Sequence, residues 1–426
     1  MRQCSHITQL LTFFVKEENR RVGGYLLIIL IFIGFSGCYP QSTETFSTQQ
    51  KRDFLEHYWS RPLDPQGNPP PPFNSIETAL NPATCGNCHP TQWTDWQKSL
   101  HRRAMGAGIL GQLVNLPTEA TEEHQVCLRC HAPLNEQAKS LMTLLSHNTV
   151  NNMETPLHEQ GVMCAVCHLR EFQWYGPPRQ DGSQPNGDLT QFPHNAWQSH
   201  PAFSDSQFCA ACHQFKQDEY TLNGKLLENT YQEWQQSRYQ KEGITCQKCH
   251  LPQRRHLWRG IHDPDMTKTG IDIQVQNFKI STTHISAELS IKNSGTGHYF
   301  PTYVTPKVIV QGYQENQQGQ PLSHTLQQYV IHRQVTIDLS EEISDTRLAP
   351  DEQLSFYYYA QIDSKATALI FYIRVEPDAF YTEFYQTLLE QKLAGMGQQL
   401  IEQAFKDSQK SMYTLYLNKL PLATNH

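Results

Sequence analysis

Alternation of hydrophobic and polar residues dominates the second half of the chain. Turn-forming Gly, Pro, Asn and Asp residues separate the alternating segments, which are Ile271–Ile280, Ile285–Ile291, Lys307–Tyr313, Gln328–Leu339, Leu354–Ala360 and Ala368–Val375. Short alternating strands joined by turns predict an antiparallel β-sandwich-like domain, which we place at residues 266–377.

A helical period replaces this alternation near the C-terminus. Between Ala379 and Leu417 the hydrophobic residues recur every three or four positions and share one face: Phe384, Leu388, Leu389, Leu393, Met396 and Leu400. We expect a long C-terminal helix within residues 378–426 that packs on the rest of the protein or on a partner. A further helix is predicted after Pro90, over the segment WTDWQKSLH.

The N-terminal pattern is typical of a segment for export. Arg20 and Arg21 precede an apolar run from Val22 to Phe35, which is too short for a comfortable membrane span. The run ends in Phe-Ser-Gly-Cys38 and resembles the lipobox of bacterial lipoproteins, which implies acylation of Cys38. Alternatives are an exported protein cut nearby and an uncleaved anchor. We interpret residues 1–37 as a signal peptide and the proline-rich residues 38–78 as a tether.

Composition narrows the class of protein. The 426 residues are 38% hydrophobic and 11% aromatic, which is too apolar for a disordered chain. Asp and Glu (41) outnumber Lys and Arg (34), so the chain has no overall basic character for binding nucleic acid. The unusual counts are 12 Cys and 20 His, and their arrangement directs the interpretation.

Ten cysteines form pairs with one spacing, Cys-x-x-Cys-His. The pairs are Cys85/Cys88, Cys127/Cys130, Cys164/Cys167, Cys209/Cys212 and Cys246/Cys249, followed by His89, His131, His168, His213 and His250. This spacing is the attachment motif of c-type haem. Two thiols add to the two vinyl groups of one haem, and the adjacent imidazole becomes the proximal iron ligand. The chain is therefore predicted to carry five covalent haems c.

Disulfides and zinc ribbons are the alternatives for paired cysteines in an exported chain. Neither requires the histidine that follows every pair, which favours haem. The motifs follow one another at about 33 residues per haem, too few to build an apolar core around each macrocycle. We therefore expect a mainly α, haem-packed multihaem cytochrome domain at residues 79–265, in which the haems pack against one another.

The sixth position of each iron decides between electron transfer and chemistry at the metal. Candidate distal ligands are His101, His124, His158, His200, His256, His262 and His298. Six further histidines are interpreted as structural or solvent-exposed: His57, His147, His194, His284, His324 and His332. The sequence leaves open which histidine serves which haem.

Together the motifs resemble the multihaem cytochromes of the cytochrome c-554-like superfamily. The resemblance covers roughly residues 80–305 and is carried by CGNCHP with WTDWQKSLHRRAM, CLRCHAPL, GVMCAVCH, FCAACHQF, ITCQKCHLP with RRHLWRGIHD, and NSGTGHYFPT. It implies axial roles for His101, His256 and His262, and for His298 as a ligand supplied by the following domain. The small prototype of the superfamily has four haems, whereas this chain has five motifs. The haem order and ligand pairing of the prototype are therefore not applied to this chain.

Arginines accompany the proposed ligands. Arg102, Arg103, Arg254, Arg255 and Arg259 are expected either to pair with haem propionates or to form a solvated face. Loss of residues 1–37 would remove four basic and two acidic residues and change the formal charge from −7 to −9. A positively charged redox partner or an arginine-lined docking face is therefore expected.

Electron transfer is the function that the motifs favour. Closely packed haems would pass electrons between redox protein partners in the periplasm or at the outer membrane, where a lipid anchor would hold the protein. Two alternatives stay open. One is a multihaem oxidoreductase that acts on a small nitrogen or sulfur compound at one open haem. The histidine in every motif counts against it, because pentahaem nitrite reductases use Cys-x-x-Cys-Lys at the active site. The other is a haem-bearing structural subunit of a larger redox complex.

Overall fold

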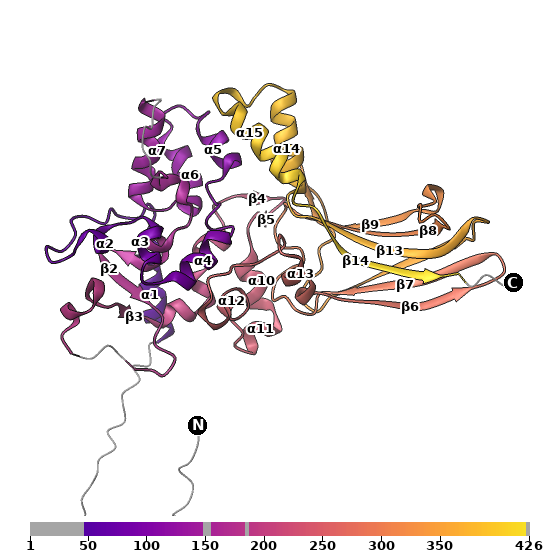
Figure 1. Ribbon diagram of the computed structural model, residues 1–426, viewed down its shortest axis with the longest axis horizontal. Coiled ribbons are helices and arrows are strands. Elements are labelled where there is room, and N and C mark those ends of the chain that lie inside the picture. Colours follow the sequence, from indigo (N-terminus) through magenta and orange to yellow (C-terminus); the bar gives the residue numbers. More distant parts are fainter. Residues whose placement is uncertain (1–46, 148–154, 184–186, 423–426) are drawn as a thin grey trace, which may run out of the picture. The chain divides into compact units, whose positions relative to one another are not determined.

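The computed structural model describes residues 47–147, 155–183 and 187–422 (Figure 1). The expected signal peptide, Cys38 and the first part of the tether lie outside the described residues. Residues 45–426 form one compact unit. None of the helices described here has the length and apolar character needed to cross a bilayer.

Short helices build the part of this unit that carries the Cys-x-x-Cys-His motifs. They are α1 (Thr48–Tyr58), α2 (Ser75–Thr78), α3 (Pro82–Gly86), α4 (Pro90–Lys98), α5 (Ala107–Leu113), α6 (Thr121–His131), α7 (Asn135–His147), α8 (Cys164–His168), α9 (Ala210–His213), α10 (Thr230–Gln236), α11 (Arg238–Lys241), α12 (Cys246–His250) and α13 (Pro264–Gly270). Side-chain caps define several starts, such as Ser47 at α1 and Asn81 at α3. The helix predicted after Pro90 is α4, and His101 lies in the turn beyond its end.

Very short strands connect these helices. β1 (Leu169–Arg170), β2 (Gln173–Gly176) and β3 (Gln198–Ser199) form one small sheet directly after the third motif. β4 (Thr221–Leu222) and β5 (Lys225–Leu226) form a hairpin after the fourth. Short pairs of neighbouring strands, rather than an extended sheet, therefore stabilise the connections between motifs.

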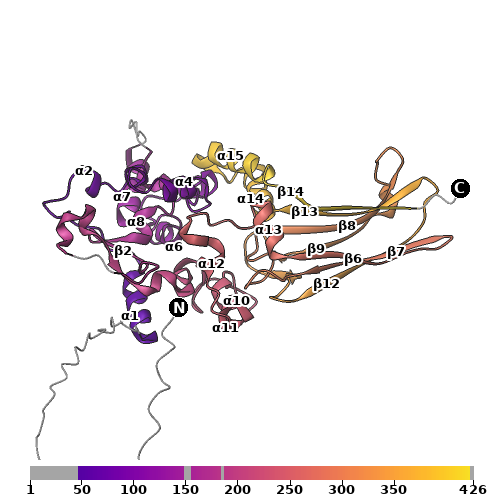
Figure 2. The ribbon, with the colours of Figure 1, turned by 60° about the horizontal axis from the view of Figure 1, so that its bottom comes forward.

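Two antiparallel sheets follow the last motif, and their strands run in the same general direction (Figure 2). One has the order β12-β7-β6 and the other the order β14-β13-β8-β9, while β10 and β11 form a separate pair. The bounds are β6 (Asp272–Ile280), β7 (His284–Lys292), β8 (Lys307–Asn316), β9 (Gln327–Ile331), β10 (Arg333–Val335), β11 (Glu342–Asp345), β12 (Gln353–Gln361), β13 (Ala366–Glu376) and β14 (Tyr413–Pro421). The strands occupy the segments in which the alternation predicted them, except that β11 and β14 were not predicted.

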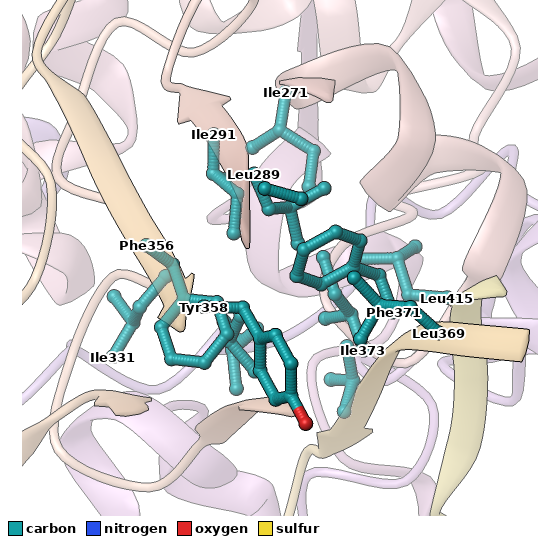
Figure 3. Close-up of a cluster of buried hydrophobic side chains, with 14 of the residues drawn as sticks. Ile271, Leu289, Ile291, Ile331, Phe356, Tyr358, Leu369, Phe371, Ile373 and Leu415 are labelled. Atoms are coloured by element: carbon teal, nitrogen blue, oxygen red, sulfur yellow. The ribbon is translucent and has the colours of Figure 1, made fainter. Parts of the chain in front are cut away.

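The inner faces of the two sheets form one apolar core (Figure 3). Along β12, Phe356 and Tyr358 point inward and are buried, whereas Tyr357 and Tyr359 point outward. Gly312 of β8 allows close packing, because a Cβ there would lie 2.7 Å from the Tyr358 ring. This is the period-two burial of a β-sandwich.

The C-terminal segment differs from the single long helix that we expected. It forms α14 (Ala379–Glu390) and α15 (Gln398–Gln409), and then β14 pairs with β13. The break falls at Gly395, whose φ of 48° suits glycine, and at Gly397, where a Cβ would lie 2.0 Å from the Gly111 carbonyl oxygen. The close approach lets α15 dock on α5 of the helical part. Sequence periodicity did not predict the break between α14 and α15, because the same spacing of hydrophobic residues fits two short helices as well as one long helix.

Replacing Phe371 by Ala is expected to lower the free energy of unfolding by about 3–5 kcal/mol, since the ring is completely buried between the sheets. Tyr357→Ala, on the outer face with 68% of the residue exposed, should change it by no more than about 0.5 kcal/mol. Urea denaturation followed by circular dichroism compares the two. Equal losses would contradict the inner and outer assignment.

Candidate functional site

Each Cys-x-x-Cys-His motif forms a turn of helix. The His89 N–H donates to the Cys85 carbonyl (2.9 Å), and the His213 N–H donates to the Cys209 carbonyl (3.0 Å). The two cysteines of a motif are three residues apart, so a helical turn places both thiols on one side. The following histidine ends the turn.

Backbone carbonyls orient the rings of several motif histidines. The Nδ1 atom of His131 lies 2.6 Å from the Ala104 oxygen, that of His168 lies 2.9 Å from the Tyr175 oxygen, and that of His250 lies 2.8 Å from the Arg259 oxygen. Because a carbonyl only accepts, Nδ1 carries the proton and Nε2 keeps its lone pair. Histidine that ligates a metal is held in this way.

Burial keeps these rings neutral. It lowers the pKa of His168 and of His250 to about 4, so neither ring is protonated at neutral pH. A neutral imidazole is the form that binds a metal ion. Both rings are therefore in the correct protonation and tautomeric state for an axial ligand.

Three histidine pairs have the spacing of imidazoles that bind one metal ion from opposite sides. Their ring centroids are 6.2 Å apart in His168–His256, 6.3 Å in His101–His213 and 6.5 Å in His250–His298. A metal–imidazole bond is about 2 Å long, and the ring centre lies about 1 Å further out, so two rings across one ion have centroids about 6 Å apart. Each pair joins a motif histidine to a predicted distal residue. The residues thus fit a haem with two imidazole ligands at the third, fourth and fifth motifs.

An ion pair positions His256. The carboxylate of Asp95, on α4, accepts two hydrogen bonds of 2.6 Å from the Arg255 guanidinium and one of 3.0 Å from the His256 N–H. Asp95 is buried, and Arg255 holds the pKa of its carboxyl below the ordinary value. The Arg255 side chain is also half exposed to solvent, and its two expected roles, propionate partner or solvated charge, stay predictions.

His298 comes from the loop between β7 and β8, at one end of the sandwich. Its backbone carbonyl accepts hydrogen bonds from Asn293 (2.9 Å) and Thr296 (2.7 Å), and its Nδ1 lies 2.9 Å from the Tyr299 carbonyl oxygen. The Tyr299 N–H donates to Glu233 of α10 (3.0 Å). A loop of the β-domain is thus fixed against the helical part, with its histidine facing His250.

His194 is a candidate that sequence reasoning missed. Its Nδ1 lies 2.7 Å from the Ala196 carbonyl oxygen, and its N–H donates to Glu77 (2.7 Å). Burial, and after it the charge of His194, lowers the pKa of His89. Residues 194–196 all have positive φ, an unusual turn that holds the ring in place. No sequence signal separates His194 from the other histidines, because the turn forms only in the folded chain.

His124 and His158, two further expected ligands, are buried with one ring nitrogen unpartnered. His124 and His158 are completely buried, and the Nε2 of each has no hydrogen-bond partner among the described residues. Each Nδ1 is held, by the Ala120 carbonyl (2.7 Å) and by the Ser140 hydroxyl (2.9 Å) respectively. Both keep the geometry of a ligand, although no contact pairs either of them with a motif histidine in the described part of the chain.

His200 and His262 are engaged in other contacts. The Nδ1 of His200 accepts a hydrogen bond from the Ala202 N–H (3.2 Å), and its ring stacks on Phe54 at 3.6 Å. The Nε2 of His262 lies 2.9 Å from the Asp378 carboxylate. These contacts occupy ring nitrogens in the structure, and the axial roles expected for both residues stay predictions.

Thiols of different motifs meet in pairs. Contact with Cys85 and burial raise the pKa of Cys164, contact with Cys130 and burial raise that of Cys212, and contact with Cys246 and burial raise that of Cys209. The charge of Cys167 also contributes to the raised pKa of Cys209 and of Cys212. The first motif therefore adjoins the third, the third adjoins the fourth, and the fourth adjoins both the fifth and the second.

Cys88 and Cys249 differ from the other eight motif cysteines in their exposure. Both are exposed, whereas the others are half-buried.

Exposure does not remove Cys88 from the candidate attachment site. Its N–H donates to the Cys85 carbonyl (3.2 Å), so the two cysteines share one helical turn. Both thiols therefore still lie on one side of the turn, as attachment to a single haem requires. A haem held there would have one edge in contact with solvent.

The alternative uses of the cysteines find no support in the described residues. All ten described cysteines are free, and no three His, Cys, Asp or Glu side chains in the same residues gather as a structural zinc site requires. The histidine pairs face one another across the motifs instead. This donor set suits c-type haem better than zinc.

Comparisons with known proteins agree with this geometry. Residues 84–169, which include the first three motifs, match the family "Cytochrome c554 and c-prime". The fold is similar to that of a penta-haem cytochrome c552 from Thermochromatium tepidum, with a TM-score of 0.56 and 18% identity, over 82% of this chain and 100% of that one. No curated protein matches the chain. The prediction of a multihaem c-type cytochrome is confirmed, whereas the axial assignments stay predictions.

His194→Ala is expected to convert about one fifth of the haem from low spin to high spin, because it removes the imidazole beside His89. The matched control is His200→Ala, which lies in the same segment and whose ring stacks on Phe54. Electron paramagnetic resonance of the oxidised proteins measures the change. An unchanged spectrum for His194→Ala would exclude it as a ligand.

Proposed function

We propose that this protein is an electron carrier that conducts through five covalently attached c-type haems. The observation that carries this proposal is the set of facing histidines, with centroids 6.2–6.5 Å apart at three motifs. Two imidazoles on one iron give a low-spin centre with no open position, which exchanges electrons without binding substrate. The protein contributes ligand identity, burial and spacing.

The contacts between motifs support a continuous path. Thiols of the first and third motifs meet, as do thiols of the fourth and fifth, and the charge of Cys167 in the third motif acts on Cys209 in the fourth. The second adjoins the fourth through Cys130 and Cys212. We therefore infer a row of four haems with a branch at the fourth motif. Aromatic rings fill the spaces between, for example Phe203, which stacks on His168 at 5.6 Å.

The β-domain has a part in this function, since it supplies His298. A buried ion pair of 3.4 Å between Arg347 and Glu233 ties the sandwich to α10 beside this loop. Arg333, which is also buried, donates to the Leu226 and Leu227 carbonyls beyond the fourth motif (2.8 and 3.2 Å). A rigid connection of this kind keeps the axial ligand in one geometry and therefore holds the potential of that haem constant.

Purified protein should have the mass of the mature polypeptide plus five haems, and a spectroelectrochemical titration should take up five electrons. The centres at the third, fourth and fifth motifs should be low spin, because two imidazoles face one another there. Colourless protein, or the bare polypeptide mass after expression with the haem attachment machinery, would refute the proposal.

We also propose that the carrier is exported and held at a membrane by acyl chains on Cys38, as its lipobox-like sequence suggests. The tether would allow the haem region to reach redox protein partners in the periplasm or at the outer membrane. Charge complementarity would favour partners with a basic docking face.

Cys38→Ser is expected to abolish incorporation of labelled palmitate and to release the protein into the soluble periplasmic fraction. Its haem content should not change, because the motifs begin only at Cys85. Fractionation and a haem stain measure both properties. Continued membrane association of the variant would show that another segment is the anchor.

A further inference from the structure

One tryptophan ring lies between two of the predicted distal imidazoles. The indole of Trp258 meets the ring of His101 edge-on, with centroids 4.8 Å apart and planes at 66°, and it meets the ring of His256 at 4.9 Å and 88°. His101 faces His213 of the fourth motif, and His256 faces His168 of the third. Trp258 therefore contacts the distal sides of two different motifs at once.

The two imidazoles differ in their hydrogen bonds. The Nδ1 of His256 lies 3.0 Å from the Arg254 carbonyl oxygen, and the His256 N–H donates to Asp95 (3.0 Å), so hydrogen bonds orient this residue. The Nδ1 of His101 is buried and has no hydrogen-bond partner among the described residues. Packing against neighbours such as Trp258 therefore has to fix the plane of the His101 ring.

The backbone of Trp258 is held in an unusual conformation. Its φ is 40°, which a bulky residue adopts only when its surroundings hold it there. The Trp258 N–H donates to the carbonyl of His250 in the fifth motif (3.0 Å), and two residues earlier Asp95 of α4 accepts the His256 N–H. Backbone strain of this kind persists only where the surrounding structure over-determines it. The indole is thus fixed from the fifth motif and from α4.

The place of Trp258 coincides with a gap in the contacts between thiols. Thiols meet between the first and third motifs, between the fourth and fifth, and between the second and fourth. Among the described cysteines no such pair joins the third motif to the fourth, where the charge of Cys167 acts on Cys209 and Cys212. The ring that contacts the distal imidazoles of both motifs therefore connects them at this junction.

We propose that Trp258 is a positioning residue shared by the third and fourth haems: its indole fixes the ring planes of His101 and His256, so that one side chain sets the potentials of two haems. The orientation of an axial imidazole and the groups packed around it tune the potential of the iron that it binds. This inference rests on the haems of the proposed function and deepens it. Electrons that travel along the row pass between these two haems, and a shared residue keeps their potentials in a fixed relation.

Trp258→Leu removes the ring and should shift two of the five haem signals, both in the electron paramagnetic resonance of the oxidised holoprotein and in midpoint potential. At a fixed applied potential, the ratio of oxidised to reduced haem should change by up to about tenfold at these two centres, because one edge-on ring contact is worth a factor of about two to ten. Trp59→Leu is the matched control, with all five signals unchanged. Trp59 is also half-buried and packs on the same hydrophobic cluster, but among the described residues its ring meets only those of Tyr58 and Phe208.

Trp258→Phe separates positioning from folding, because it keeps an aromatic ring at this place. It should shift the same two haem signals in the same direction as Trp258→Leu, by a smaller amount, and it gives the result by itself if the leucine variant loses haem. Unchanged signals in either variant with five haems bound would overturn the inference, as would a shift of one haem alone or an equal shift of all five. Fewer than five haems in the unmodified protein would instead contradict the proposed function.

Discussion

The hydrogen bond between a histidine Nδ1 and a backbone carbonyl is the interaction on which the candidate site depends. It sets the tautomer, so that Nε2 keeps the lone pair an iron ligand needs, and it fixes the plane of the ring. At His131, His168 and His250 the carbonyl belongs to a connecting segment outside the motif helix, namely Ala104, Tyr175 and Arg259. The path of these connecting segments therefore decides the direction of each ring, and the surrounding fold acts as the outer shell of every metal site.

The β-sandwich completes the haem-binding part of the chain rather than standing apart from it. Its β7–β8 loop presents His298 to His250 of the fifth motif. A hydrogen bond from Tyr299 to Glu233 and the buried ion pair between Arg347 and Glu233 hold this loop against α10. Removing one partner of a buried ion pair is costly, so this connection stabilises the docked arrangement.

Sequence reasoning succeeded where the pattern is local and repeated. The spacing within each motif and the alternation along β6 to β13 report on residues that are neighbours in the helix or strand. It does not reach contacts that distant segments decide. The sequence alone does not show the positive-φ turn at 194–196, in which the His194 N–H donates to Glu77. Nor does it show that Asp378, more than a hundred residues later, lies 2.9 Å from the Nε2 of His262, whose axial role stays a prediction. The helix break at Gly395 and Gly397 depends on contact with α5.

The amino-acid sequence by itself determined the covalent chemistry of this protein. Thiols three positions apart and an adjacent imidazole define an attachment site in any helical turn, and alternating strands define the two faces of a sandwich. Only the tertiary structure decided which imidazoles face one another and which motifs adjoin. The reason is physical: two axial nitrogen atoms lie about 4 Å apart on opposite sides of one metal ion, and residues from distant parts of the chain meet at that distance only through packing.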